Sequence, residues 1–248
     1  MLKRLALSGL LFVVAISGAQ ALEESRVQAI KQASDELVAL AGDSAKTGNP
    51  PRITDPKVAD LLKRMTDTKE IEGTNTVPFA QIPLLTTWNT AVLTAFRVYV
   101  GAGTDGMTEQ QKAVEGDKNI VKFQNETGSI VDAMLRLQAA IIDTAQGFVA
   151  SATPQQLENP NVKNGLGMIA NGAAQTMQGF SIVLTLEGLT DAWREARIPA
   201  IIALAPRTAK VVSPEAKTAL RNLALAAKEK VTSAKVKAAF DQIASALQ

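Results

Sequence analysis

The apolar positions of this chain recur at intervals of three and four residues, and no segment alternates apolar and polar positions over the length of a strand. Such a recurrence is typical of amphipathic α-helices. The longest example covers about residues 108–151, where two adjacent apolar seams run along the same segment. We expect one long helix there, either straight or kinked near Gly128 and Ser129. Two seams on one helix predict contact with at least two partner helices. The pattern therefore predicts an all-α protein.

Helix-start and helix-end signals divide the chain into separate elements. Asp55 precedes Pro56 as an N-cap would, and a capping box begins at Thr108. A helix expected over about 190–204 has Pro199 in its interior, which should kink it or end it early. Further helices are expected over about 23–45, 55–65, 83–103, 166–184 and 233–248. We predict a mostly antiparallel multi-helix bundle of six to eight helices.

The first 21 residues have the three parts of a secretory signal peptide. Lys3 and Arg4 precede an apolar run over 5–16, and Ala21 closes a cleavage site of small residues. We predict cleavage after Ala21 and a periplasmic or secreted protein. The alternative is an uncleaved N-terminal anchor, for which the run is short, since a spanning helix needs ~20 residues. Residues 22–248 show no marked linker and are expected to form a single helical bundle domain.

The chain contains no cysteine and no histidine. These absences exclude a thiol nucleophile, a Ser-His-Asp triad, a zinc-thiolate site and histidine ligation of a metal. We therefore predict no metal, no cofactor and no enzymatic activity. A hydrolase that works with carboxylates alone stays as a third hypothesis, because glycoside hydrolysis needs no histidine. The aromatic content of 4% leaves few platforms for sugar stacking.

Charge is balanced over the whole chain but uneven along it. Cleavage after Ala21 would remove two of the 26 basic residues and none of the 24 acidic ones, leaving a formally neutral protein. Neutrality excludes the basic footprint of a nucleic-acid-binding protein. The segment 207–248 has eight basic and three acidic residues. We favour a basic end docked on the protein's own acidic body; the alternative is an anionic membrane surface bound by Lys228, Lys230, Lys235 and Lys237.

The stretch NGLGMIANGAAQTMQGF, residues 164–180, places Gly165, Gly172 and Gly179 seven residues apart. It matches neither the dinucleotide-binding glycine pattern nor a phosphate-binding loop. Glycine inside a helix is unfavourable by ~1 kcal/mol relative to alanine, so three on one face need a reason. We predict that they allow close packing against a neighbouring helix.

The same region is free of charged side chains from Gly165 to Leu186. Polar residues such as Asn171 and Gln175 oppose a membrane-spanning role, because lipid cannot satisfy their hydrogen bonds. We favour a buried central helix. The alternative is a helix that inserts into membranes, where small residues and amides also hold helices together.

Four ionisable residues lie within apolar helices: Arg97, Asp132, Arg136 and Asp143. Buried charges need partners, so we expect Arg97 to pair with a carboxylate of the long helix, and Asp143 is the first candidate. The four residues either form structural ion pairs or line a polar ligand pocket inside the bundle.

Taken together, the sequence favours an exported, non-enzymatic helical protein with a binding or structural role. Its partner would be an unknown protein or a small apolar ligand held in an internal pocket. The alternative is a membrane-active protein, amphitropic or pore-forming, that uses the uncharged helix and the basic end.

Overall fold

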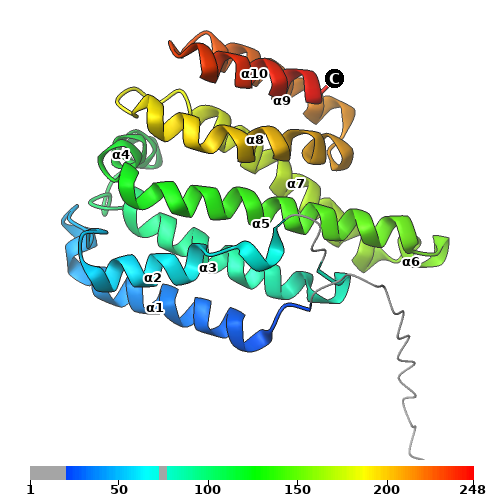
Figure 1. Ribbon diagram of the computed structural model, residues 1–248, viewed down its shortest axis with the longest axis horizontal. Coiled ribbons are helices and arrows are strands. Elements are labelled where there is room, and N and C mark those ends of the chain that lie inside the picture. The colour runs from blue at the N-terminus through cyan, green and yellow to red at the C-terminus, as the bar shows by residue number, and fades with distance from the viewer. Residues whose placement is uncertain (1–20, 73–76) are drawn as a thin grey trace, which may run out of the picture.

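The computed structural model describes residues 21–72 and 77–248, and every regular element within them is helical (Figure 1). The ten α-helices are α1 Glu24–Lys46, α2 Pro56–Thr66, α3 Ile82–Val100, α4 Glu109–Lys122, α5 Gln124–Ser151, α6 Pro154–Glu158, α7 Pro160–Val183, α8 Asp191–Val211, α9 Pro214–Lys228 and α10 Ala234–Ala246. Two 3-10 helices, η1 Lys69–Ile71 and η2 Phe79–Gln81, lie between α2 and α3. The all-α prediction is confirmed for the described residues, whose ten α-helices exceed the six to eight predicted. Except for Ala21, the predicted signal peptide lies outside them.

The helices lie side by side and rise roughly in chain order from α1 at the bottom of Figure 1 to α9 and α10 at the top. Helix α5 lies in the middle of this stack. It packs against α2 and α3 on one side and against α7 and α8 on the other. Helix α1 packs on α2 and α3, and α9 and α10 cover α7 and α8. The prediction that the long central segment touches at least two partner helices is confirmed.

Two hydrophobic cores meet along α5. The first joins α1, α2 and α3 to one side of α5, and the second joins α7 to α10 to the other side. Phe96, Met134 and Ile169 are half-buried and contact both cores. Trp88 and Tyr99 are fully buried in the first core, and burial of one large apolar side chain contributes about 1.5 to 3 kcal/mol. The single domain over 22–248 stays a prediction.

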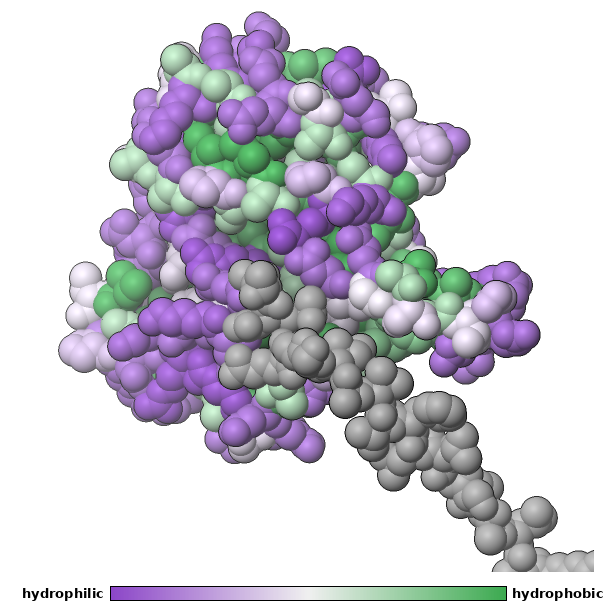
Figure 2. All heavy atoms as spheres, turned by 45° about the vertical axis from the view of Figure 1, so that its right-hand side comes forward, coloured by the Kyte–Doolittle hydropathy of each residue, from purple (hydrophilic) through white to green (hydrophobic). Residues whose placement is uncertain are grey.

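Exposed apolar surface is distributed over several elements. Hydrophilic side chains cover most of the face in Figure 2, and hydrophobic ones gather in its upper part, over α8 to α10. The most exposed large apolar side chain among the described residues is Met168 of α7, at 75%. In the described ranges no helix combines the length and the apolar character needed to cross a bilayer.

The predicted single helix over 108–151 is wrong, because the chain breaks at Phe123 between α4 and α5. Phe123 leaves helical geometry, with φ −109° and ψ 29°, and buries its ring against Tyr99. The side chains of Arg52 and Lys122 lie over the same ring, with 5.0 and 4.9 Å to its centroid. Tertiary contacts of one aromatic ring thus redirect the chain at a point where the periodicity shows no break.

Helix α8 continues through Pro199 and Pro206, so an early end at Pro199 is wrong. Both prolines are exposed, where water can bind the carbonyl groups that lose their helical donors. Two arginines of α8 cap further carbonyls: Arg197 donates to Trp193 O at 3.0 Å and Arg207 to Ala203 O at 2.7 Å. Proline therefore removes two backbone donors without ending the helix.

The predicted role of the glycine stripe is also wrong. Helix α7 lies at the surface, and only four of its residues are buried: Ala173, Met177, Phe180 and Ser181. A Cβ atom placed on Gly165 or Gly179 meets no heavy atom within 4 Å, and one on Gly172 meets only the Gln138 amide, at 3.7 Å. No helix of the described residues packs closely on these glycines.

The glycine that does allow close packing is Gly128 of α5. A Cβ atom there would overlap the guanidinium of Arg197 and lie 3.2 Å from Nε1 of Trp193. Because Arg197 is fixed between Asp132 and Trp193, it cannot move aside without losing both contacts.

Alanine substitutions distinguish a glycine that faces open space, Gly165, from one that allows close packing, Gly128. Gly165→Ala should raise the free energy of unfolding by about 0.5 to 1 kcal/mol, because it improves helix propensity in open space. Gly128→Ala should lower it by about 1 to 3 kcal/mol through overpacking. Urea unfolding followed by circular dichroism measures both, and equal stability of the two variants would contradict this assignment.

Candidate functional site

Three of the four predicted ionisable residues lie on α5, but the predicted pair between Arg97 and Asp143 is wrong. Arg97 is exposed on α3, outside the buried stripe of that helix, and forms no ion pair with the described residues. Asp143 instead binds Arg207 of α8, whose Nε lies 2.9 Å from both carboxylate oxygens. The sequence identified the half-buried carboxylate but not its partner.

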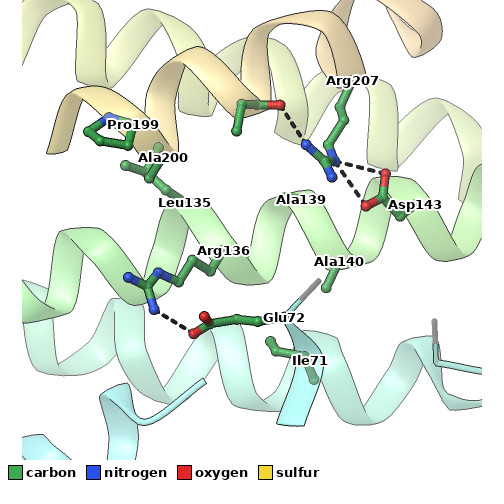
Figure 3. A pocket seen from close by; sticks show the side chains of 11 residues that line it. Ile71, Glu72, Leu135, Arg136, Ala139, Ala140, Asp143, Pro199, Ala200 and Arg207 are labelled. Carbon is green, nitrogen blue, oxygen red and sulfur yellow. Dashed lines mark hydrogen bonds and ion pairs between the residues drawn. The ribbon is translucent and has the colours of Figure 1, made fainter. Parts of the chain in front are cut away.

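Arg136 and Asp143 line a groove between α5 and α8 with a volume of about 300 Å³ (Figure 3). Arg136 pairs with Glu72, next to η1, and Asp143 pairs with Arg207. Small side chains such as Ala140 and Ala200 lie between the two pairs. Each charge already has an opposite charge, and partly exposed pairs of this kind contribute only ~0–1 kcal/mol. The groove therefore offers an incoming ligand no unpaired charge.

Asp132 forms the most buried of these pairs. Its Oδ2 lies 3.1 Å from the Arg197 guanidinium, which stacks 4.7 Å from the Trp193 ring centroid. The Nε of Arg197 is buried without a partner among the described residues. Burial raises the pKa of Asp132 above its ordinary value although Arg197 and Arg136 oppose the shift. Burial likewise lowers the pKa of Arg197, which Asp132 opposes. This pair has the contacts of a structural junction rather than of a ligand site.

A second groove lies between α3 and α7, and α5 forms its floor. We call it the amide groove, because three of its polar lining residues are the carboxamides Asn89 of α3, Gln138 of α5 and Gln175 of α7. Its volume is about 340 Å³. The groove exists because α3 and α7 both pack on α5 but barely touch each other.

Glycine keeps this groove open. Gly172 and Gly179 line its α7 side, and a side chain at Gly179 would meet only free space. The lower walls are apolar and are formed by Leu93, Phe96, Met134, Phe180 and Val183. No acidic or basic side chain lines the groove. The sequence analysis found the glycine spacing but assigned it to packing.

Gln138 is the unusual residue of the amide groove. Its side chain is 6% exposed, and its amide forms no hydrogen bond with any described residue. The amide lies beside Gly172, with the oxygen 3.7 Å and the nitrogen 3.9 Å from the position of a Cβ atom there. Asn89, Gln175 and Thr176 also have no side-chain hydrogen bond within the described ranges. By contrast, Thr90 of α3 bonds the carbonyl four residues back, as helical threonines do.

A third, more apolar pocket of about 390 Å³ lies where the ends of α5 and α8 meet the first half of α7. Val149, Leu166 and Ile169 line it, and Lys210 is its one charged lining residue. Its apolar walls would suit the predicted small apolar ligand better than those of the other two cavities. However, they contain no buried unpaired polar group that would fix the orientation of a ligand.

The basic end of the chain is partly neutralised by the protein itself. Lys235 of α10 binds Glu195 of α8 at 2.8 Å, and Lys228 binds Asp241 at 2.8 Å. The hydrogen bond to Asp241 raises the pKa of Lys228. Lys230 and Lys237 have no ion pair with the described residues. Only the Lys235–Glu195 contact joins the basic end to the body, because Lys228 and Asp241 both belong to that end. An external anionic partner stays a prediction.

Sequence reasoning missed one buried carboxylate, Glu126 of α5. It is fully buried, and its Oε1 accepts hydrogen bonds from Arg52 Nε at 2.9 Å and from Ile53 N at 3.0 Å. Burial and the nearby Glu126 carboxylate raise the pKa of Tyr99. The sequence did indicate this residue, because Glu126 lies next to the apolar seam. A charged residue at the edge of such a seam is usually exposed to water, so its burial was not predicted. In the described ranges no group of three acidic residues could hold a metal ion.

The ionisation of Asp132 should appear in the pH dependence of stability. The folded protein holds the Asp132 proton more tightly than the unfolded chain, so the stability contributed by protonation is lost as the pH rises from 3.8 through the raised pKa. Asp132→Asn should remove this loss. Urea unfolding of both proteins across this acid range measures the difference, and parallel stability curves would contradict the raised pKa.

Comparisons with models of protein families, with curated proteins and with solved structures found no match to this chain. Evidence on its function therefore comes from the described residues themselves. Of the three cavities described above, only the amide groove is lined by a polar residue that is less than a tenth exposed and forms no side-chain hydrogen bond with the described residues.

Proposed function

We propose that this protein is an exported, non-enzymatic binding protein whose ligand lies in the amide groove between α3 and α7. The observation that supports it is Gln138, a residue only 6% exposed that lines the groove and whose amide has no hydrogen-bond partner in the described residues. A ligand that forms hydrogen bonds with Gln138 would use an amide that no described residue engages.

The size and surface of the groove suit a ligand. Its volume of about 340 Å³ lies near the lower end of the range for small-molecule sites, ~300–1,000 Å³. Such sites combine apolar walls with a few placed polar groups, as the phenylalanines and carboxamides do here. Because no charged side chain lines the groove, the part of the ligand inside it is uncharged.

Binding rather than catalysis follows from the same composition. General acid-base catalysis requires a titratable group that exchanges a proton with the reacting atoms. None of the groove's lining side chains titrates near neutral pH. Its carboxamides can donate and accept hydrogen bonds, which orient a ligand but do not transform it. The part of the proposal that concerns export rests on the predicted signal peptide.

Filling the groove tests this proposal. Native mass spectrometry of residues 22–248, purified from the natural host, should show a bound ligand. Gly179→Leu places a side chain in the groove and should remove the adduct. Gly167→Leu is the matched control, because Gly167 lies in the same helix, faces open space and does not line the groove. That variant should keep the adduct.

The outcomes are distinct. An adduct that survives Gly179→Leu places the ligand elsewhere and overturns the assignment of the site. An adduct that Gly167→Leu also removes would mean that a bulky residue anywhere on α7 disturbs the protein, and Gly179→Ala then serves as the milder variant. Circular dichroism of each variant confirms that the helices are retained.

A further inference from the structure

We infer that the ligand of the amide groove is an extended, uncharged peptide segment, bound through its backbone by Asn89, Gln138 and Gln175. The inference rests on the proposed function and specifies its ligand. The evidence is the length of the groove, the chemistry of its polar groups and the character of its floor.

The groove has the length of a short extended peptide. Along α7 its lining runs from Gly172 to Val183, and at 1.5 Å per residue this distance is about 16 Å. Along α3 it runs from Asn89 to Phe96, about 10 Å. An extended chain advances about 3.3 Å per residue, so some five residues would span the α7 wall.

The polar groups match a peptide backbone. A carboxamide has a carbonyl acceptor and two N–H donors, and an extended backbone presents the complementary C=O and N–H groups along its length. The three carboxamides come from three different helices, so they surround the groove instead of gathering at one point. None of them has a hydrogen-bond partner in the described chain, and all three are therefore available to a ligand.

The floor suits apolar side chains. In an extended strand, successive side chains point to opposite faces, so every second one would face α5. There they would meet Met134 of α5, flanked by Phe96 of α3 and Phe180 of α7. A charged side chain in these positions would find no counter-ion and would lose its water, which is strongly unfavourable.

Two other occupants fit less well. A docked α-helix already bonds its own backbone groups, so it would leave Gln138 without a partner. A compact small molecule could reach Gln138, but pairing with Asn89 and Gln175 as well would require polar groups placed along the same length. An extended peptide meets both requirements.

Selection from a random heptapeptide display library tests the inference on residues 22–248. Enriched peptides should be uncharged in the middle and apolar at alternating positions. Synthetic copies should bind with little dependence on salt, because no charge pair forms. Methylation of central backbone nitrogens should weaken binding.

Gln138→Leu is the decisive variant. It should weaken peptide binding about tenfold, the loss expected for removing one or two neutral hydrogen bonds. Its melting temperature should stay equal or rise, because the amide that it replaces forms no hydrogen bond within the described residues. A residue with a merely structural role would show the opposite, a fall in melting temperature.

A matched pair of surface glutamines provides the control. Gln175 lines the groove, whereas Gln178 is exposed on the same helix and does not line it. Gln175→Ala should weaken binding of the selected peptides, and Gln178→Ala should leave it unchanged.

Failure of this inference can be told from failure of the proposed function. If Gly179→Leu removes a host adduct but no peptide is enriched, the ligand is not a peptide and the proposed function stands. Enriched peptides that bind Gln138→Leu as tightly as the parent protein also overturn the inference. If neither an adduct nor an enriched peptide is found, both proposals fall.

Discussion

Burial of α5 on two sides is the constraint on which the rest of the structure depends. The helix contributes to both hydrophobic cores, so the polar side chains on its buried faces need partners within the protein. Glu126 finds Arg52, Asp132 finds Arg197 and Asp143 finds Arg207. These pairs come from elements far away in the chain, and they tie the neighbouring helices to α5. Gln138 lines the amide groove and has no such partner, while Glu126 Oε2 and Thr144 Oγ1 are buried without a partner among the described residues.

Features that depend on neighbouring residues were predictable from the sequence. Asp55 and Thr108 each cap a helix through a side-chain hydrogen bond, because capping involves only the next few residues. The break at Phe123 was not predictable, since an aromatic ring seated among distant side chains decides it. Local signals thus located the helices, whereas tertiary contacts decided where the longest predicted helix divides.

Only part of the candidate site was predictable, because the rest depends on contacts between helices that are distant in the sequence. Periodicity showed that Gly165, Gly172 and Gly179 share one face of a helix, but it could not show what lies opposite that face. Packing and an open groove both favour small residues, and a single sequence does not distinguish them. The identity of Gln138 as the unpaired group depends on α3 and α7 standing apart, which no local pattern encodes. The same holds for Arg97, whose exposure follows from the rotation of α3 about its axis.

Because the amide groove lies between the two hydrophobic cores, a ligand bound there would affect how the cores are positioned. Its α3 wall belongs to the first hydrophobic core and its α7 wall to the second. A ligand that contacts both walls would bridge the two halves of the molecule. By linkage, it would stabilise the distance between the α3 and α7 walls at which it binds. Conversely, any force that changes the angle between the halves changes the width of the groove and therefore the affinity. Under the proposed function, occupancy of the groove would therefore depend on the relative position of the two cores.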